Sequence, residues 1–128
     1  MSKKILIAED EVVLRESLAE LLTEEGYQVI EVENGRQLAE CLVKPRGHSC
    51  PRPDLVISDI RMPGHTGLEV LAALRESDWA MPVILVTAFG DKDTHEEARR
   101  LGAALVVDKP CSVELMVHAV RDTVPPSI

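Results

Sequence analysis

The chain alternates short apolar runs with longer segments in which apolar residues recur at helical spacing. The five runs lie at about residues 4–9, 27–32, 54–58, 82–87 and 104–108. They are rich in Val, Ile and Leu and short enough to be strands, and the second run alternates with polar residues. Strands that alternate with helices along a chain usually form a parallel sheet covered by those helices. The pattern therefore predicts an α/β fold with five parallel strands.

The segments between the runs show helical periodicity. After the first run, Leu14, Leu18, Leu21 and Leu22 fall on one face of a helix that Gly26 ends. Further helices are expected at about residues 36–43, 67–76 and 92–101, and from near Ser112, a good N-cap residue, to Pro125-Pro126. In the last three helices, the side chains expected to face the core are Leu68, Leu71, Leu74, Ala98, Leu101, Val113, Met116, Val117 and Val120.

One stretch shows neither the alternation of a strand nor the apolar spacing of a helix. Residues 44–53 contain three prolines and a glycine, which break regular structure, so we expect an exposed loop there. The 128 residues are enough for one domain with a real core, which we expect to span residues 1–124. Residues 125–128 would be a tail or the start of a linker, and the chain could equally be a complete small protein or a fragment.

The composition narrows the functional classes. With 45% apolar and 28% charged residues, the chain has the composition of a globular protein. Its net charge of −8 argues against non-specific nucleic-acid binding and favours metal cations and basic protein surfaces as partners. No apolar run approaches the roughly 18 residues that span a bilayer, and the N-terminal run is too short for the core of a signal peptide. We therefore expect a cytoplasmic protein that does not enter membranes.

The cysteines do not indicate a metal centre. Cys41, Cys50 and Cys111 have no C-x-x-C spacing and no clustered histidines, so we do not expect a zinc site. An odd number of cysteines in a reducing compartment indicates free thiols, with a bridge between Cys41 and Cys50 left open as an alternative.

The most informative residues are polar and come at the ends of the apolar runs. Glu9 and Asp10 close the first run, Asp59 follows the third, Thr87 closes the fourth, and Lys109 follows the fifth. In an open parallel sheet the carboxyl ends of the strands share one edge, where ligands bind. We therefore expect three carboxylates, one hydroxyl and one ammonium to converge at that edge.

This set of groups suits a divalent cation and a phosphoryl group. Three carboxylates beside one ammonium leave a charge of about −2, which Mg²⁺ would balance, with Asp10 and Asp59 as direct ligands and Glu9 bound through water. The cation would screen an incoming phosphoryl group from Asp59, so that this carboxylate could attack phosphorus and form an aspartyl phosphate. Lys109 would pair with the phosphoryl oxygens, and Thr87 would donate a hydrogen bond.

The motifs, taken in order, resemble the receiver domain of bacterial two-component response regulators over nearly the whole chain. Each motif is weak alone, but all of them occur in order and at spacing similar to that of the family. The matching segments are Ile5-Leu6-Ile7-Ala8-Glu9-Asp10-Glu11, Asp59-Ile60-Arg61-Met62-Pro63-Gly64-His65-Thr66-Gly67, Thr87-Ala88, Gly102-Ala103 and Lys109-Pro110. The resemblance implies a doubly wound, flavodoxin-like (βα)5 receiver fold with strand order 2-1-3-4-5.

The resemblance also implies a signalling function. A histidine kinase or phosphotransfer protein would supply a phosphoryl group, and the domain would then change conformation to control a target or an output domain. The face made by the fourth helix, the fifth strand and the last helix would be read by that partner or would form a homodimer. The Lys109–Pro110 bond would be cis. The implied site residues are Asp59, Thr87 and Lys109 for the phosphoryl chemistry, and Glu9, Asp10, Asp59 and the backbone carbonyl of Arg61 for Mg²⁺.

Two positions depart from the family pattern. Glu9 stands where the family often has a first aspartate, and its side chain is one methylene longer. Val106 stands where the family usually has a Tyr or Phe ring that turns inward when the threonine moves. Because valine has no ring, the resemblance does not imply such a movement in this chain. We expect instead a rearrangement of the loop after Thr87, in which Phe89 lies near the mouth of the site.

Three rival functions fit parts of the pattern less well. A Mg²⁺-dependent aspartyl-phosphate phosphohydrolase commonly has a second acid two residues after its nucleophile, where this chain has Arg61. A flavodoxin-like cofactor binder needs a Ser-, Thr- or Gly-rich phosphate loop after the first strand, where Glu9, Asp10 and Glu11 would repel a phosphate. A receiver used only for binding would not need the acidic and basic site residues, all of which are present.

Overall fold

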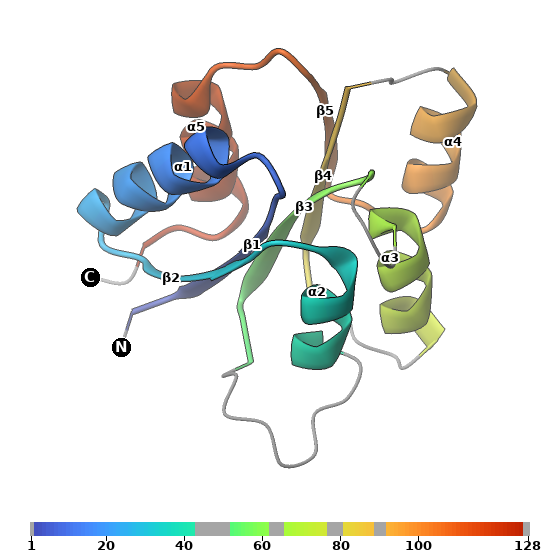
Figure 1. The fold of residues 1–128 in the computed structure, drawn as a ribbon, viewed down its shortest axis with the longest axis horizontal. Coiled ribbons are helices and arrows are strands. Elements are labelled where there is room, and N and C mark those ends of the chain that lie inside the picture. Colours follow the sequence, from blue (N-terminus) through green and yellow to red (C-terminus); the bar gives the residue numbers. More distant parts are fainter. Residues whose placement is uncertain (1, 43–51, 62–65, 77–80, 89–91, 127–128) are drawn as a thin grey trace.

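The chain forms a five-stranded parallel sheet with helices on both faces (Figure 1). The computed structural model describes residues 2–42, 52–61, 66–76, 81–88 and 92–126. The strands are β1 (Lys4–Ala8), β2 (Gln28–Val32), β3 (Leu55–Asp59), β4 (Val83–Thr87) and β5 (Leu105–Asp108). The helices are α1 (Val12–Glu24), α2 (Gly35–Leu42), α3 (Gly67–Glu76), α4 (Lys92–Arg100) and α5 (Val113–Thr123).

The strand order is β2-β1-β3-β4-β5 with every neighbouring pair parallel, which confirms the predicted doubly wound fold. Helices α1 and α5 lie side by side on one face, and α2, α3 and α4 cover the other (Figure 1). Alternate residues of a strand therefore pack into two separate cores. Ile5 and Ile7 pack with α1 and α5, whereas Leu6 and Ala8 pack with α2, α3 and α4.

Burial is greatest at the centre of the sheet. Every residue of β3 and β4 is buried, because helices cover both faces of these strands and other strands pair with both of their edges. In contrast, β5 is an edge strand, and none of its four residues is fully buried. The sheet therefore has a rigid centre and a more exposed edge at β5.

The predicted helical faces are confirmed, with differences at the edges of the apolar stripes. Leu18 and Leu22 of α1 are buried, whereas Leu14 and Leu21 are half-buried. Val113, expected in the core, is also half-buried at the start of α5. A helix buries the centre of its apolar stripe most completely, so residues at the margins of the stripe keep part of their exposure.

Local signals account for two helix boundaries. Gly26 follows α1 with a φ of 100°, a left-handed conformation that glycine adopts without strain. Ser112 caps α5 as predicted, because its side-chain oxygen accepts a hydrogen bond from the Leu115 N–H at 3.4 Å.

Tyr27 differs from its prediction as the first residue of β2. Its N–H donates to the Leu22 carbonyl at 3.1 Å and so completes the end of α1 rather than joining the sheet. The ring is buried, as expected of a packing residue. Its hydroxyl donates to the Val124 carbonyl at 2.7 Å, which ties the start of β2 to the end of α5.

Some predictions lie outside the described residues. They concern Cys50 and its alternative bridge to Cys41, most of the loop at residues 44–53, and Phe89. Among the helices that the structure describes, none is long and apolar enough to cross a membrane.

Candidate functional site

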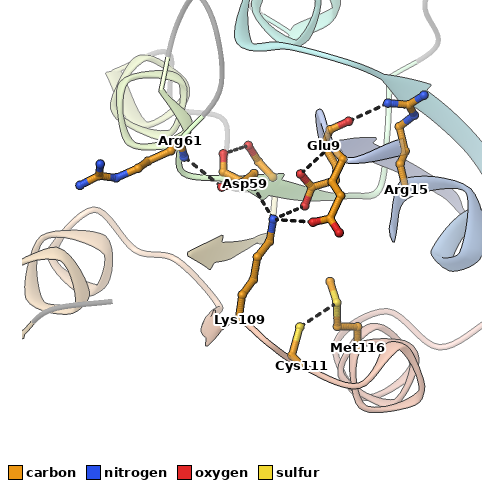
Figure 2. A network of polar contacts seen from close by, with 9 residues as sticks. Glu9, Arg15, Asp59, Arg61, Lys109, Cys111 and Met116 are labelled. Atoms are coloured by element: carbon orange, nitrogen blue, oxygen red, sulfur yellow. Dashed lines mark hydrogen bonds and ion pairs between the residues drawn. The ribbon is translucent and has the colours of Figure 1, made fainter. Parts of the chain in front are cut away.

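Polar side chains from three strand ends meet at the carboxyl edge of the sheet (Figure 2). Glu9 comes directly after β1, Asp59 is the last residue of β3, and Lys109 comes directly after β5. One carboxylate oxygen from each of Glu9, Asp10 and Asp59 lies within 4.8 Å of the others. The predicted convergence is confirmed for these four residues, and it follows from the parallel arrangement of the strands.

The Lys109 ammonium lies between the acidic groups. Its Nζ is 2.7 Å from Asp59 Oδ2, 2.8 Å from Glu9 Oε1 and 3.6 Å from Glu11 Oε2. Burial alone would lower the pKa of Lys109, but its hydrogen bonds and ion pairs with Asp59 and Glu9 raise this pKa above its ordinary value. Lys109 therefore stays charged at every physiological pH and reduces the repulsion between the carboxylates.

The Asp59 carboxylate is buried and has a defined orientation. Its Oδ2 accepts from Lys109, and its Oδ1 accepts from the backbone N–H of Arg61 at 3.0 Å. The backbone around it is equally constrained, because the Ile60 N–H donates to the Val86 carbonyl at 2.8 Å. The first residue of α3, Gly67, approaches so closely that a Cβ there would lie 2.8 Å from the Asp59 carbonyl oxygen. Only glycine fits at that position without a shift of the backbone.

Glu9 is a buried acid whose charge is only partly balanced. Burial raises the pKa of its carboxyl to about 7, and the nearby Asp59 charge adds to this effect, although the hydrogen bond from Lys109 opposes it. Its Oε2 also accepts from the Glu11 N–H at 3.2 Å. In the protein without a cation, Glu9 is therefore protonated over much of the range below neutral pH.

Thr87 and Lys109 are linked through their backbones. Thr87 is 1% exposed and is the last residue of β4, where it pairs in register with Asp108. The Lys109 N–H donates to the Thr87 carbonyl at 2.7 Å. The Lys109–Pro110 bond is cis, as the resemblance implied. A displacement of Thr87 would therefore act directly on the segment that carries Lys109.

Arg61, a predicted site residue, and Val106, which departs from the family pattern, differ from the acids and Lys109. The Arg61 side chain is exposed and points away from the carboxylates, so its contribution to the site comes from its backbone (Figure 2). Val106, at the position of the expected ring, is half-buried and packs against the core on the α4 side.

The structure also reveals two polar pairs that the sequence analysis missed. Arg15 of α1 is buried and donates to the backbone carbonyl of Glu9. His95 Nε2 of α4 lies 2.8 Å from Asp108 Oδ1 at the end of β5. Arg15 had a detectable signal, because it precedes Leu18 and Leu22 by three and seven residues and so lies on the apolar face of its helix. For His95 we find no signal in the sequence.

The arrangement of strand-end acids and lysine matches one protein family. The family model for the response regulator receiver domain matches residues 5–121, which is nearly the whole chain. The chain belongs to the response regulator receiver domain family. This receiver domain is therefore a phosphoacceptor signalling domain of the two-component type, and such proteins interact with histidine kinases or phosphotransferases.

Individual relatives support this assignment. The receiver domain is 35% identical over 125 residues to sporulation initiation phosphotransferase F of Bacillus subtilis, a match that covers 98% of this chain and 96% of that protein. It is 35% identical over 120 residues to the transcriptional regulatory protein PdtaR of Mycobacterium tuberculosis, a match that covers 93% of this chain but 55% of the relative.

A solved structure agrees in fold. A DNA-binding response regulator of the LuxR family from Staphylococcus aureus is similar with a TM-score of 0.80 at 31% identity, covering 94% of this chain and 97% of that chain.

Proposed function

We propose that this receiver domain accepts a phosphoryl group on Asp59. The observation that carries the proposal is a buried Asp59 carboxylate that faces the Lys109 ammonium at 2.7 Å and lies beside Glu9 and Asp10. A carboxylate held in one orientation next to a fixed cation is well placed to attack phosphorus. The donor would be a histidine kinase or a phosphotransfer protein in the cytoplasm.

The transfer would be a displacement at phosphorus. One Asp59 oxygen forms the new P–O bond while the P–N bond to the donor imidazole breaks, and the electron pair of that bond stays on the imidazole nitrogen. Lys109 would then pair with the phosphoryl oxygens, and the Thr87 hydroxyl would donate a hydrogen bond to one of them. Because the product stays on the domain, we propose signalling by self-modification rather than enzymatic turnover of an external substrate.

The donor set fits Mg²⁺. Three carboxylates with oxygens within 4.8 Å of one another provide the hard oxygen ligands that this ion prefers. Asp10 and Asp59 would bind it directly, Glu9 would bind through water, and the Arg61 backbone carbonyl would complete the set from the protein. When bound, the cation reduces the repulsion between the Asp59 carboxylate and an incoming anionic group.

We expect the affinity for Mg²⁺ to fall as the pH falls through 7. Below its raised pKa of about 7, Glu9 holds a proton in the metal-free protein, and cation binding must release that proton. One competing proton of this pKa lowers the apparent affinity about tenfold between pH 8 and pH 6. Titration calorimetry should show this dependence in the native protein and a flatter one in Glu9→Gln. Equal slopes in both proteins would assign the dependence to a different group.

An open pocket lies beside Lys109, and we propose that a phosphoryl donor approaches the site from this side. Its volume is about 340 Å³, and it is lined by Glu11, Leu14, Ala88, Lys109, Pro110 and Cys111. The adjoining first turns of α1 and α5 carry the apolar side chains of Val13 and Leu115, which are 75% and 66% exposed. Exposed apolar side chains beside a polar site suit the surface of a helical partner. We propose that the kinase or phosphotransfer protein docks over these two residues.

Acetyl phosphate tests the assignment without a kinase. Incubation with acetyl phosphate and Mg²⁺, followed by intact-mass measurement and peptide mapping, should show one added phosphoryl group on the peptide that contains Asp59. A phosphoryl group on any other peptide would contradict the proposal.

The face formed by α4, β5 and α5 is our proposed output surface, read by a target, an output domain or a second copy of the chain. At the position where the family usually has an aromatic ring that turns inward, this chain has Val106. The His95–Asp108 contact of 2.8 Å joins α4 to the end of β5, and Asp108 is the residue that pairs in register with Thr87. Movement of Thr87 toward a phosphoryl group would therefore reach α4 through Asp108 and His95.

We expect the stable phosphoryl mimic beryllofluoride to change amide exchange mainly between about residues 87 and 100. The reason is that the Thr87 hydroxyl gains a charge-assisted hydrogen bond, and its shift is passed to α4. Hydrogen-exchange mass spectrometry with and without the mimic measures this change, and Asp59→Asn serves as the control. A change centred on Val106, with residues 87–100 unaffected, would show that this account of the switch is wrong.

A further inference from the structure

Arg15 is a charged residue on the buried face of α1. Its side chain is 10% exposed, and the same helix face buries Leu18, Ala19 and Leu22. A guanidinium keeps its charge at physiological pH, and its burial is unfavourable unless hydrogen-bond partners satisfy it. The partners of Arg15 therefore indicate what this buried charge does.

Two groups among the described residues hold the guanidinium, and Figure 2 shows the one that belongs to the proposed cation site, the backbone carbonyl of Glu9. Nη1 donates a buried hydrogen bond to the backbone carbonyl of Glu9 at 2.8 Å. Nε lies 3.3 Å from Glu31 Oε1, on the neighbouring strand β2. The N–H of Glu9 donates to the Val32 carbonyl of β2 at 3.2 Å. Glu9 is thus held by β2 through its N–H and by Arg15 through its carbonyl.

The carbonyl that Arg15 holds is part of the peptide group between Glu9 and Asp10. This peptide group is planar, so a hydrogen bond that fixes its carbonyl limits the rotation of the turn and the directions in which both side chains leave it. The two carboxylates repel each other and Asp59, so a turn without this restraint would allow them to separate. The restraint keeps their oxygens close enough together to share one ion.

We propose that Arg15 is a positioning residue for the cation site, which holds the Glu9–Asp10 peptide so that both carboxylates face Asp59. This inference rests on the Mg²⁺ site of the proposed function. Residues that orient the ligands of a metal ion usually affect its affinity about 10- to 100-fold. Since the hydrogen bonds of Arg15 are to the turn and to β2, its loss should weaken cation binding more than it slows phosphoryl transfer once the cation is bound.

The test compares Arg15→Met with two controls. Glu31→Gln weakens the ion pair but leaves the hydrogen bond to the Glu9 carbonyl. Arg121→Met removes an exposed arginine that pairs at 3.5 Å with Glu25, at the C-terminal end of α1. Titration calorimetry should show a Kd for Mg²⁺ that is at least about tenfold higher in Arg15→Met, with less than a threefold change in either control.

A kinetic measurement separates positioning from general damage. For Arg15→Met, the Mg²⁺ concentration that half-saturates labelling by acetyl phosphate should rise by the same factor as the Kd, while the rate at saturating Mg²⁺ stays within about threefold of the native rate. A Kd within twofold of native in the folded variant would overturn the proposal. So would a lower rate at saturation with an unchanged half-saturating concentration.

A second variant covers the case in which Arg15→Met does not fold. Arg15→Lys keeps the charge but has a single donor nitrogen in place of the two that bond the Glu9 carbonyl and Glu31, so its Kd for Mg²⁺ should exceed that of Glu31→Gln. Equal Kd values for these two variants would overturn the proposal. Absence of Mg²⁺ binding by the native protein would instead contradict the proposed function itself.

Discussion

Replacing Asp59 with asparagine is expected to reduce phosphoryl incorporation by about a hundredfold or more. The amide is nearly isosteric with the carboxylate, and its one oxygen can still accept one of the two hydrogen bonds, from Lys109 or from the Arg61 N–H, that hold the native side chain at 2.7 and 3.0 Å. It lacks the anionic oxygen that attacks phosphorus, so the loss should appear in the chemical step itself. Intact-mass measurement after incubation with acetyl phosphate and Mg²⁺ gives the result.

A matched control separates this loss from unfolding. Asp122→Asn makes the same chemical change on the exposed side of α5 and should be labelled at the native rate. Circular dichroism should show that both variants are folded. Undiminished labelling of a folded Asp59→Asn protein would mean that another side chain accepts the phosphoryl group.

Removal of divalent cations is expected to have an effect of similar size. Without a cation, an incoming phosphoryl group meets the carboxylates of Glu9, Asp10 and Asp59, whose charge Lys109 partly offsets. Labelling by acetyl phosphate in excess EDTA should therefore fall about a hundredfold or more, because the repulsion acts on the transition state as well as on binding.

Restoration with excess Mg²⁺ is the control for this experiment. The native rate should return when Mg²⁺ exceeds the chelator, and Ca²⁺, which takes longer bonds and more ligands, should restore it less well. A labelling rate that is the same with and without EDTA would contradict any role of a cation in the transfer.

The convergence of Glu9, Asp59 and Lys109 could be predicted because it depends on strand topology alone. In a parallel sheet every strand ends at the same edge, so residues that directly follow apolar runs must meet there. The same reasoning placed the strand ends to within one residue: the first strand was predicted to end at Glu9, but β1 ends at Ala8, and the third was predicted to end at Ser58, but β3 includes Asp59. Glu9 nevertheless continues the ladder with its N–H, which shows how small that difference is.

The features that could not be predicted depend on exact distances between elements. The raised pKa of Glu9 requires both its burial and the 2.8 Å contact with Lys109, and neither has a signature in the sequence. Arg15 donates to a backbone carbonyl, and every residue has one, so the sequence does not indicate this partner. The sequence shows only that a charged residue lies on the apolar face of its helix. The His95–Asp108 contact depends on how α4 lies against β5, a tertiary relation that periodicity does not determine.

The different burial of the strands has a mechanical consequence. Asp59 and Thr87 stand on β3 and β4, where every residue is buried, whereas Lys109 follows β5, where no residue is fully buried. Local opening of a protein is least costly where few buried contacts must break, so β5 is the compliant side of the sheet. The proposed acceptor Asp59 therefore lies on a fully buried strand, whereas its partner Lys109 follows a partly exposed one. If a phosphoryl group is added at Asp59 as proposed, we expect the sheet to respond mainly at β5, on the side of the proposed output surface.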